Sequence, residues 1–214
     1  MGEIFLSLGE GLKWLGLALS PALFLPLLLL ALPHKYLNYF KTLPRILEQA
    51  TSSALSLAMG GALIMLGAQL LVIIGRYIFE WSASWANEII IYSFAALFLL
   101  AAASALKADD HVRVDIFREK MSVKSKAAID LIGLYLFLFP ICLLILWAAI
   151  SPSFVRSWAN LEGSRESDGL PIYFLFRTLI PLFAVLLINQ GLVEALRACF
   201  RLRGVDTAPF ERSA

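Results

Sequence analysis

The sequence has few charged residues, few histidines and few cysteines for its 214 residues. Only 16% of the residues are charged and 60% are hydrophobic, whereas a typical soluble domain is about 25% charged. This shortage of charge excludes an ordinary soluble globule and intrinsic disorder. A formal net charge of +2 is also too close to balance for a nucleic-acid-binding protein, which needs a concentrated basic face. A polytopic membrane protein remains.

The cysteines and histidines do not form a recognisable metal or redox set. Cys142 lies inside an apolar run and Cys199 lies near the C-terminal end, so neither a disulfide framework nor a metal site is predicted. His34 and His111 fall outside the apolar runs, whereas haem binding within a membrane needs histidines paired across helices. No phosphate-binding loop, zinc motif or Ser-His-Asp set is found. We therefore expect no cofactor, no metal and no enzymatic activity.

Five stretches with at most one charge are long enough to cross a membrane, which takes roughly 20 largely apolar residues. Four of them are 54–75, 89–106, 131–155 and 170–193. The fifth, 14–32, contains Pro21 and Pro26, which should bend a helix. Its apolar part is too long for a typical signal peptide, and no convincing small-x-small cleavage site follows it. We interpret it as a retained helix.

These stretches predict an all-α integral membrane protein. We expect an extra N-terminal transmembrane helix over 1–33, an amphipathic interfacial segment over 34–50, a four-helix membrane domain over 51–200 and a cytoplasmic tail over 201–214. In the interfacial segment, apolar residues recur at three- and four-residue steps between charged ones: Leu37, Phe40, Leu43 and Leu47. Pro44 weakens a continuous helix there, and a plain connector is the alternative.

The distribution of lysine and arginine predicts the orientation in the membrane. Thirteen basic residues lie in the alternate segments 33–50, 107–126 and the C-terminal tail, and five lie elsewhere. Because cytoplasmic loops are enriched in lysine and arginine, we expect the thirteen to face the cytoplasm. The N-terminus and the loops 76–88 and 156–169 are then outside, and the C-terminus is inside.

The central parts of the apolar stretches carry no charge, which argues against an ion pathway within this chain. Charged residues such as Glu194 lie near the ends of the stretches, where they can reach headgroups or water. Small residues recur instead at seven-residue steps, at Ser53, Gly60 and Gly67. Small residues let helix backbones approach closely, so this stripe predicts packing within the bundle or a docking surface for another membrane protein.

The outside loop 76–88 combines aromatic and charged residues. Trp81 and Trp85 fit an aromatic belt at the membrane–water interface. Ser84 is a good helix N-cap, and Glu88 lies near the first turn, where the helix dipole favours a negative charge. Glu88 has a second interpretation, as the partner of an arginine such as Arg76 at a subunit contact. The sequence leaves both open.

Two further loops carry information. The inside loop contains His111, Arg113 and Asp115, and the four-residue spacing of His111 and Asp115 is only a weak metal signal. A hydrogen-bonded corner at the membrane edge is the interpretation we favour. The outside segment 151–169 is polar and rich in turn residues near its end, which predicts either a solvated loop or a contact for an external partner.

Several of these elements together resemble a known family. Three of them are similar in type and order to the DctQ-type small membrane subunits of TRAP transporters: Arg76-Tyr77, Ser84-Trp85-Ala86-Asn87-Glu88 and His111-Val112-Arg113-Val114-Asp115. Leu170-Pro171 followed by Leu179-Ile180-Pro181 fits the same pattern. The likeness covers roughly residues 45–200, with four spans in the family's order. The stretch 14–32 is an addition to that pattern.

The resemblance implies a four-helix DctQ-type bundle plus one extra N-terminal helix, in the bacterial inner membrane. It implies a scaffold subunit of a sodium-coupled uptake transporter for an organic acid. The partners are then a large DctM-type membrane subunit that carries substrate, a DctP-type periplasmic solute-binding protein that delivers it, and membrane lipids. The candidate subunit or lipid contacts are Arg76, Trp81, Trp85, Glu88, His111, Arg113, Asp115, Gly60 and Gly67.

Two other classes of protein are alternatives. One is a membrane-anchor subunit of a redox or other membrane enzyme complex, against which the lack of paired histidines argues. The other is a small autonomous transporter, against which the lack of carboxylates within the spans argues. The sequence does not identify the substrate, because the binding protein and the large subunit select it.

Overall fold

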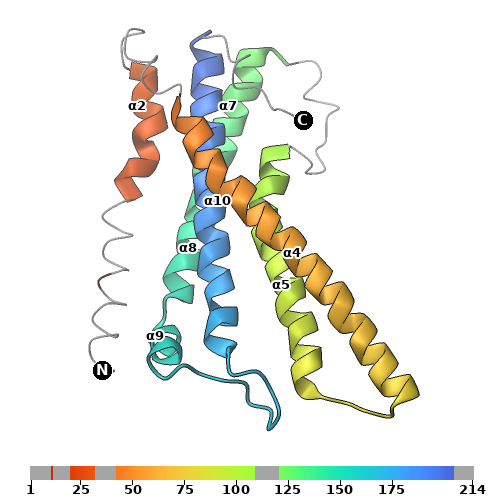
Figure 1. Ribbon diagram of the computed structural model, residues 1–214. Helices are drawn as coiled ribbons and strands as arrows, with labels where there is room; N and C mark the ends of the chain where they lie inside the picture. The colour runs from red at the N-terminus through yellow and green to blue at the C-terminus, as the bar shows by residue number, and fades with distance from the viewer. Residues whose placement is uncertain (1–10, 12–19, 32–41, 109–120, 205–214) are drawn as a thin grey trace.

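The computed structural model describes residue 11 and residues 20–31, 42–108 and 121–204 (Figure 1). Within these ranges the chain is helical, and no strand is formed. The all-α fold class predicted from the sequence is confirmed. In chain order the elements are η1 (Ser20–Phe24), α2 (Leu25–Ala31), α4 (Leu43–Ile78), α5 (Ser84–Ala108), α7 (Val123–Gly133), η3 (Leu134–Leu138), α8 (Phe139–Ala149), α9 (Pro152–Ala159) and α10 (Tyr173–Leu202).

Four helical stretches in the described residues are long and apolar enough to cross a membrane. They are α4, α5, the continuous run α7–η3–α8, and α10, and they confirm the four predicted spans of the membrane domain. The extra N-terminal span is not confirmed. Of the predicted stretch 14–32, the structure describes residues 20–31, where a five-residue 3-10 turn leads into the seven-residue helix α2.

Helix α4 is longer than the span predicted for it. Its 36 residues measure roughly 54 Å at 1.5 Å per residue, against about 30 Å of hydrocarbon in a bilayer. Pro44 lies in the first turn, where the missing N–H interrupts no helical hydrogen bond. The part of the predicted interfacial segment that the structure describes, residues 43–50, is therefore continuous with the first span.

The leucines at the start of α4 face protein. Leu43 and Leu47 are partly buried and pack against the apolar cluster of Leu29, Leu196 and Phe200. The side-chain amide of Asn189 also donates a hydrogen bond to the Leu47 carbonyl, at 2.8 Å. These contacts attach the first turns of α4 to α10 and α2. Leu37 and Phe40, the other two members of the predicted amphipathic pattern, lie outside the described residues.

The third span ends earlier than its uncharged stretch predicted. Pro140 has no N–H for the Leu136 carbonyl, and the preceding residues form the π-helical turn η3. The helix ends at Ala149, six residues before the predicted end at 155. Ser151 then caps α9, accepting a hydrogen bond from the Phe154 backbone N–H at 3.4 Å. The uncharged run therefore extends past the end of the span, because a cap and Pro152 start a new helix within it.

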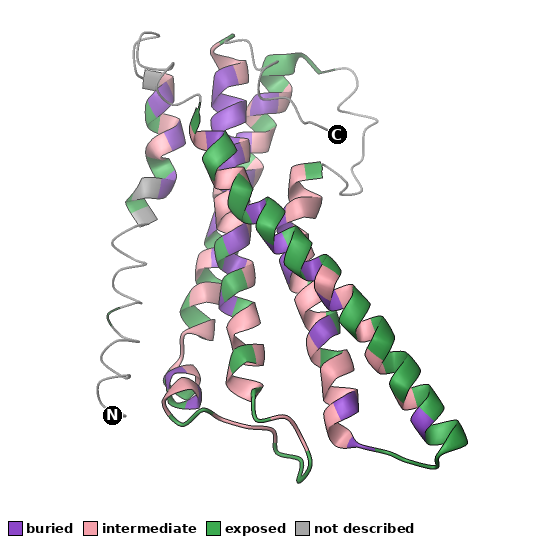
Figure 2. Cartoon of the chain, in the orientation of Figure 1, coloured by how far each residue is buried: buried purple, intermediate pink, exposed green. Residues whose placement is uncertain are grey.

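Helix α10 is the centre of the bundle and contacts α2, α4, α5, α7, α8 and α9. In its most apolar 18-residue stretch 44% of the residues are buried, against 11% for α4 and for α5. Gly191 lets α8 approach, since a Cβ at this position would be 2.9 Å from side-chain atoms of both Leu138 and Phe139. Figure 2 shows the contrast between buried α10 and the exposed length of α4 that diverges from it.

Candidate subunit interface

Helix α4 packs on α5 through one face lined by small residues. Ala54 and Ala58 are buried there against Leu100 and Ala103. Gly61 continues this face, because a Cβ at Gly61 would be only 3.3 Å from the backbone oxygen of Ser93. The close approach of α4 and α5 therefore depends on Ala54, Ala58 and Gly61. It does not depend on the stripe of small residues at seven-residue steps, Ser53, Gly60 and Gly67.

The stripe itself lies on another face of α4. A Cβ at Gly60 or at Gly67 would meet nothing within 4 Å, and Ser53 is exposed. Packing within this bundle, one of the two interpretations of the stripe, is therefore wrong for these glycines. We call this surface the open face of α4; at helical spacing it comprises Ser53, Leu57, Gly60, Ile64, Gly67 and Leu71.

The open face of α4 is apolar and is not covered by other helices of the described chain. Leu57, Ile64 and Leu71 are 68%, 58% and 46% exposed, respectively. Gly60 and Gly67 separate these larger residues and leave shallow places where another helix can approach. In a membrane such a face meets either lipid or a neighbouring protein, because no water is available to it.

The corner between α4 and α5 is organised around Trp81. Its indole ring covers Gly75, where a Cβ would be 2.6 Å from a ring carbon, and its backbone N–H donates to the Gly75 carbonyl at 2.9 Å. Trp81 and Trp85 are neighbours, with ring centroids 5.7 Å apart. Glu80 reverses the chain with a φ of 52°, in the left-handed region that non-glycine residues rarely adopt. Arg76 is exposed at this corner.

Glu88 binds a distant loop. One carboxylate oxygen accepts a hydrogen bond from the Ser164 hydroxyl, and the other accepts from the Leu170 backbone N–H at 2.7 Å. The backbone of Gly169 lies close to both hydrogen-bonded side chains, because a Cβ at this position would collide with Ser164 and lie 2.9 Å from Glu88. Among the described residues no ion pair joins Glu88 to Arg76. Of the two interpretations of Glu88, the pairing with Arg76 is therefore not formed within the described part of this chain.

Asp168 provides a second anchor for the same loop. Its carboxylate accepts a hydrogen bond from the backbone N–H of Ser84, at 2.9 Å. This hydrogen bond holds the pKa of Asp168 below its usual value. Helix α5 begins at Ser84 as expected, but an acceptor 84 residues away takes the free N–H there. The loop 160–172 therefore packs against the first turns of α5, at the same end of the bundle as the loop 79–83, as expected for loops on one side of a membrane (Figure 1).

The segment 151–169 is more ordered than a solvated loop. It forms α9, whose Trp158 donates an indole hydrogen bond to the Thr178 hydroxyl on α10 at 3.1 Å. Arg177 of α10 pairs with Glu162 at 3.3 Å and donates to the Ser153 carbonyl at 3.0 Å. These contacts and the two anchors on α5 give this end of the bundle a folded surface.

We expect Glu88→Ala to loosen this loop and Glu88→Gln to preserve most of it. Alanine removes both acceptors, whereas a glutamine amide can still accept from Leu170 and hydrogen bond with Ser164. Hydrogen exchange of the Leu170 amide measures the difference, and we expect at least tenfold faster exchange in Glu88→Ala. Glu166→Ala, which changes an exposed carboxylate in the same loop, is the control. Unchanged protection of Leu170 in Glu88→Ala would contradict the anchoring role.

A cluster of charged and polar residues joins the helices at the other end of the bundle. Arg197 donates to Glu194 at 2.8 Å and also forms an ion pair with Glu48 on α4. Lys107, in the last turn of α5, pairs with the second oxygen of Glu48 at 3.4 Å. The side chain of Arg197 is only 6% exposed, and those of Glu48 and Glu194 are 16% and 17% exposed. The expectation that Glu194 reaches headgroups or water is therefore wrong.

Two uncharged side chains continue the cluster into the bundle. The Thr51 hydroxyl donates to the side-chain oxygen of Gln190 at 3.0 Å, and both residues are fully buried. The Gln190 amide nitrogen donates in turn to Glu194 at 3.2 Å. We call this set the polar cluster; its members are Glu48, Thr51, Lys107, Gln190, Glu194 and Arg197.

The polar cluster was not predicted from the sequence, although one signal for it exists. Gln190, Glu194 and Arg197 recur at four- and three-residue steps, which places them on one face of the last span. Their partners Glu48 and Lys107 lie in distant segments, and only the fold brings them together. Of the remaining candidates, His111, Arg113 and Asp115 lie outside the described residues.

The arrangement defines a polytopic α-helical membrane protein with a folded loop surface at one end, a polar cluster at the other and an open face along α4. The family model of the tripartite ATP-independent periplasmic transporters, DctQ component, matches residues 65–201. This match covers well over half of the chain, and the chain belongs to the DctQ family. No curated protein and no solved structure matches it significantly.

Proposed function

We propose that the chain scaffolds the large membrane subunit of a sodium-coupled organic-acid transporter and helps to dock its periplasmic binding protein. Membership of the DctQ family identifies a small subunit of a TRAP transporter. The sodium coupling, the organic-acid substrate and the docking role rest on the resemblance around Trp85 and Glu88. The large DctM-type subunit, the DctP-type binding protein and inner-membrane lipids are the partners in this proposal.

The observation that carries the scaffold role is the open face of α4. This face exposes large aliphatic residues over several turns, and Gly60 and Gly67 lie between them without neighbours within 4 Å. In lipid, helices associate through close van der Waals packing, which small residues at regular spacing permit. We assign this face to the large subunit.

The orientation in the membrane supports the docking role. Because cytoplasmic segments are enriched in lysine and arginine, the excess of basic residues in 33–50, 107–126 and the tail favours the cytoplasm for these segments and the periplasm for the loops 79–83 and 160–172. In this orientation the loop surface held by Glu88 and Asp168 is available to a periplasmic protein. The polar cluster then lies at the cytoplasmic edge of the bundle.

We expect Gly60→Leu and Gly67→Leu to reduce co-purification of the large subunit several-fold. A leucine at either position fills the space through which a partner helix approaches, and its Cβ has no neighbour within 4 Å in the described chain. The measurement is the amount of large subunit retained on the affinity-tagged small subunit after detergent extraction. The yield and elution volume of the tagged subunit alone should stay unchanged.

Gly133→Leu is the matched control, because a Cβ at Gly133 also meets nothing within 4 Å but lies on a different helix. The Gly133→Leu subunit should retain as much of the large subunit as the wild type does. Wild-type retention in both α4 variants would rule out docking at the open face of α4. Substrate transport by this chain alone in liposomes would overturn the scaffold role itself.

A further inference from the structure

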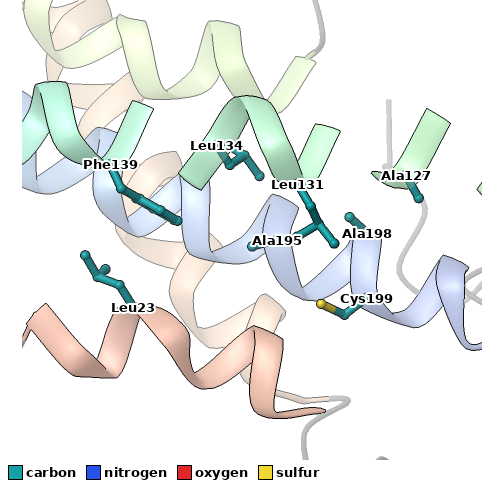
Figure 3. Packing of buried hydrophobic residues seen from close by; sticks show 8 residues of the cluster. All are labelled: Leu23, Ala127, Leu131, Leu134, Phe139, Ala195, Ala198 and Cys199. Carbon is teal, nitrogen blue, oxygen red and sulfur yellow. The ribbon is translucent and has the colours of Figure 1, made fainter. Parts of the chain in front are cut away.

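The segment 20–31 lies outside the stretch matched by the family, yet it packs closely against the bundle. Leu23, Pro26 and Leu29 recur every three residues, and all three are buried. Leu29 is 1% exposed, whereas the adjacent Leu28 is 62% exposed. One face of the segment is therefore covered by the bundle and the opposite face is open. Figure 3 shows Leu23 projecting from the segment toward the side of Phe139.

Three side chains of the bundle donate hydrogen bonds to backbone carbonyls along this buried face. The Tyr135 hydroxyl donates to Leu23 at 2.6 Å, the Cys199 thiol to Pro26 at 3.1 Å and the Arg203 guanidinium to Leu29 at 3.0 Å. The acceptors are the carbonyls of the same three residues whose side chains are buried. The bundle therefore offers both an apolar floor and a row of donors at the spacing of one helical turn.

The π-helical turn of the third span contributes the first of these donors. Tyr135 lies within η3, where the backbone departs from regular α-helical geometry. Its ring stacks on Phe24, with centroids 5.7 Å apart, and meets Phe139 edge-on at 5.0 Å. Single π turns inside helices are often found at functional sites. Here the irregular turn presents an aromatic ring and a hydroxyl to the N-terminal segment.

We propose that the surface formed by α7, η3 and α10 is a helix-docking site and that residues 20–31 are its occupant. Recognition uses backbone carbonyls and the three buried side chains, so it does not depend on the covalent connection to α4. The docked segment is an accessory element of the assembled subunit. It closes this surface to other subunits of the complex.

The test uses the full chain, with a protease site inserted between residues 33 and 42 and an affinity tag at the C-terminus. After purification in detergent, the chain is cleaved and washed on the affinity resin. We expect most of the N-terminal fragment to remain bound to the tagged part. Loss of the fragment in a single wash would overturn the proposal.

Adjacent leucines provide the matched variants. Leu29→Ala removes a buried side chain and should lower the retained fraction several-fold, whereas Leu28→Ala changes an exposed one and should leave it unchanged. Equal retention in both variants would indicate non-specific partition of the fragment into the micelle and would also overturn the proposal. Tyr135→Phe keeps the ring contacts and removes only the hydroxyl. A lowered retention in this variant would show that the hydrogen bond to the Leu23 carbonyl contributes to docking.

Discussion

Replacing Arg197 with methionine is expected to destabilise the subunit by about 3–5 kcal/mol, the usual effect of removing one partner from a buried ion pair. The substitution leaves Glu48 and Glu194 without the guanidinium that joins them, although Lys107 still neutralises part of the charge on Glu48. Because these carboxylates are mostly buried, water solvates them poorly. Thermal denaturation followed by size-exclusion chromatography in detergent measures the loss.

Two further variants separate the loss of the ion pairs from a general effect of losing a positive charge. Arg201→Met removes an arginine one turn further along α10, which forms no ion pair with any residue in the described part of the chain. It should change stability by less than about 1 kcal/mol. Adding Glu48→Gln and Glu194→Gln to Arg197→Met should recover much of the stability, since neither buried carboxylate is then charged and Lys107, whose side chain is 26% exposed, can reach water. Equal losses for Arg197→Met and Arg201→Met would refute this account.

Gly61→Leu is expected to disrupt the subunit itself, with a loss of folded yield before any partner is involved. The side chain would extend from a Cβ that is already 3.3 Å from the Ser93 backbone oxygen and 3.8 Å from Ala96. Backbone atoms of α5 cannot move aside without separating the two helices, so the effect should exceed the roughly 1–3 kcal/mol typical of overpacking. The folded fraction of the tagged subunit, measured by size-exclusion chromatography, reports the change.

The neighbouring glycine supplies the comparison. Gly60→Leu adds the same side chain at the preceding residue, where a Cβ has no neighbour within 4 Å. The subunit alone should fold normally in this variant and fail only in assembly with the large subunit. A normal folded yield for Gly61→Leu, or a low folded yield for Gly60→Leu, would show that α4 turns a different face toward α5.

The four spans and the family could be predicted from the sequence because both depend on local information. An uncharged, apolar run of about 20 residues is long enough to cross the hydrocarbon wherever it falls in the chain, and four such runs form the confirmed spans. The motif around Ser84, Trp85 and Glu88 is likewise a short local pattern. Even the common side of the loops 76–88 and 156–169 followed from the two spans between them, without any knowledge of which helices touch.

The partners of individual polar residues were decided by the tertiary structure alone. The sequence offered Glu88 either a helix-start role or the nearby Arg76 as a partner, but Glu88 binds Ser164 and Leu170 from a segment more than 70 residues away. The polar cluster joins Glu48 to Arg197 across 149 positions. The spacing of Gln190, Glu194 and Arg197 places them on one helix face, but no local pattern identifies the distant residue that each of them binds.

The faces of the helices were also decided by tertiary structure. The seven-residue stripe correctly grouped Gly60 with Gly67, yet the residue that α5 touches is Gly61. In water the buried face of a helix is more apolar than the exposed face, and the sequence reveals it. In lipid both faces are apolar, because lipid chains are as apolar as leucine. The sequence by itself therefore determined which segments cross the membrane, and only the packed bundle determined which way each helix faces.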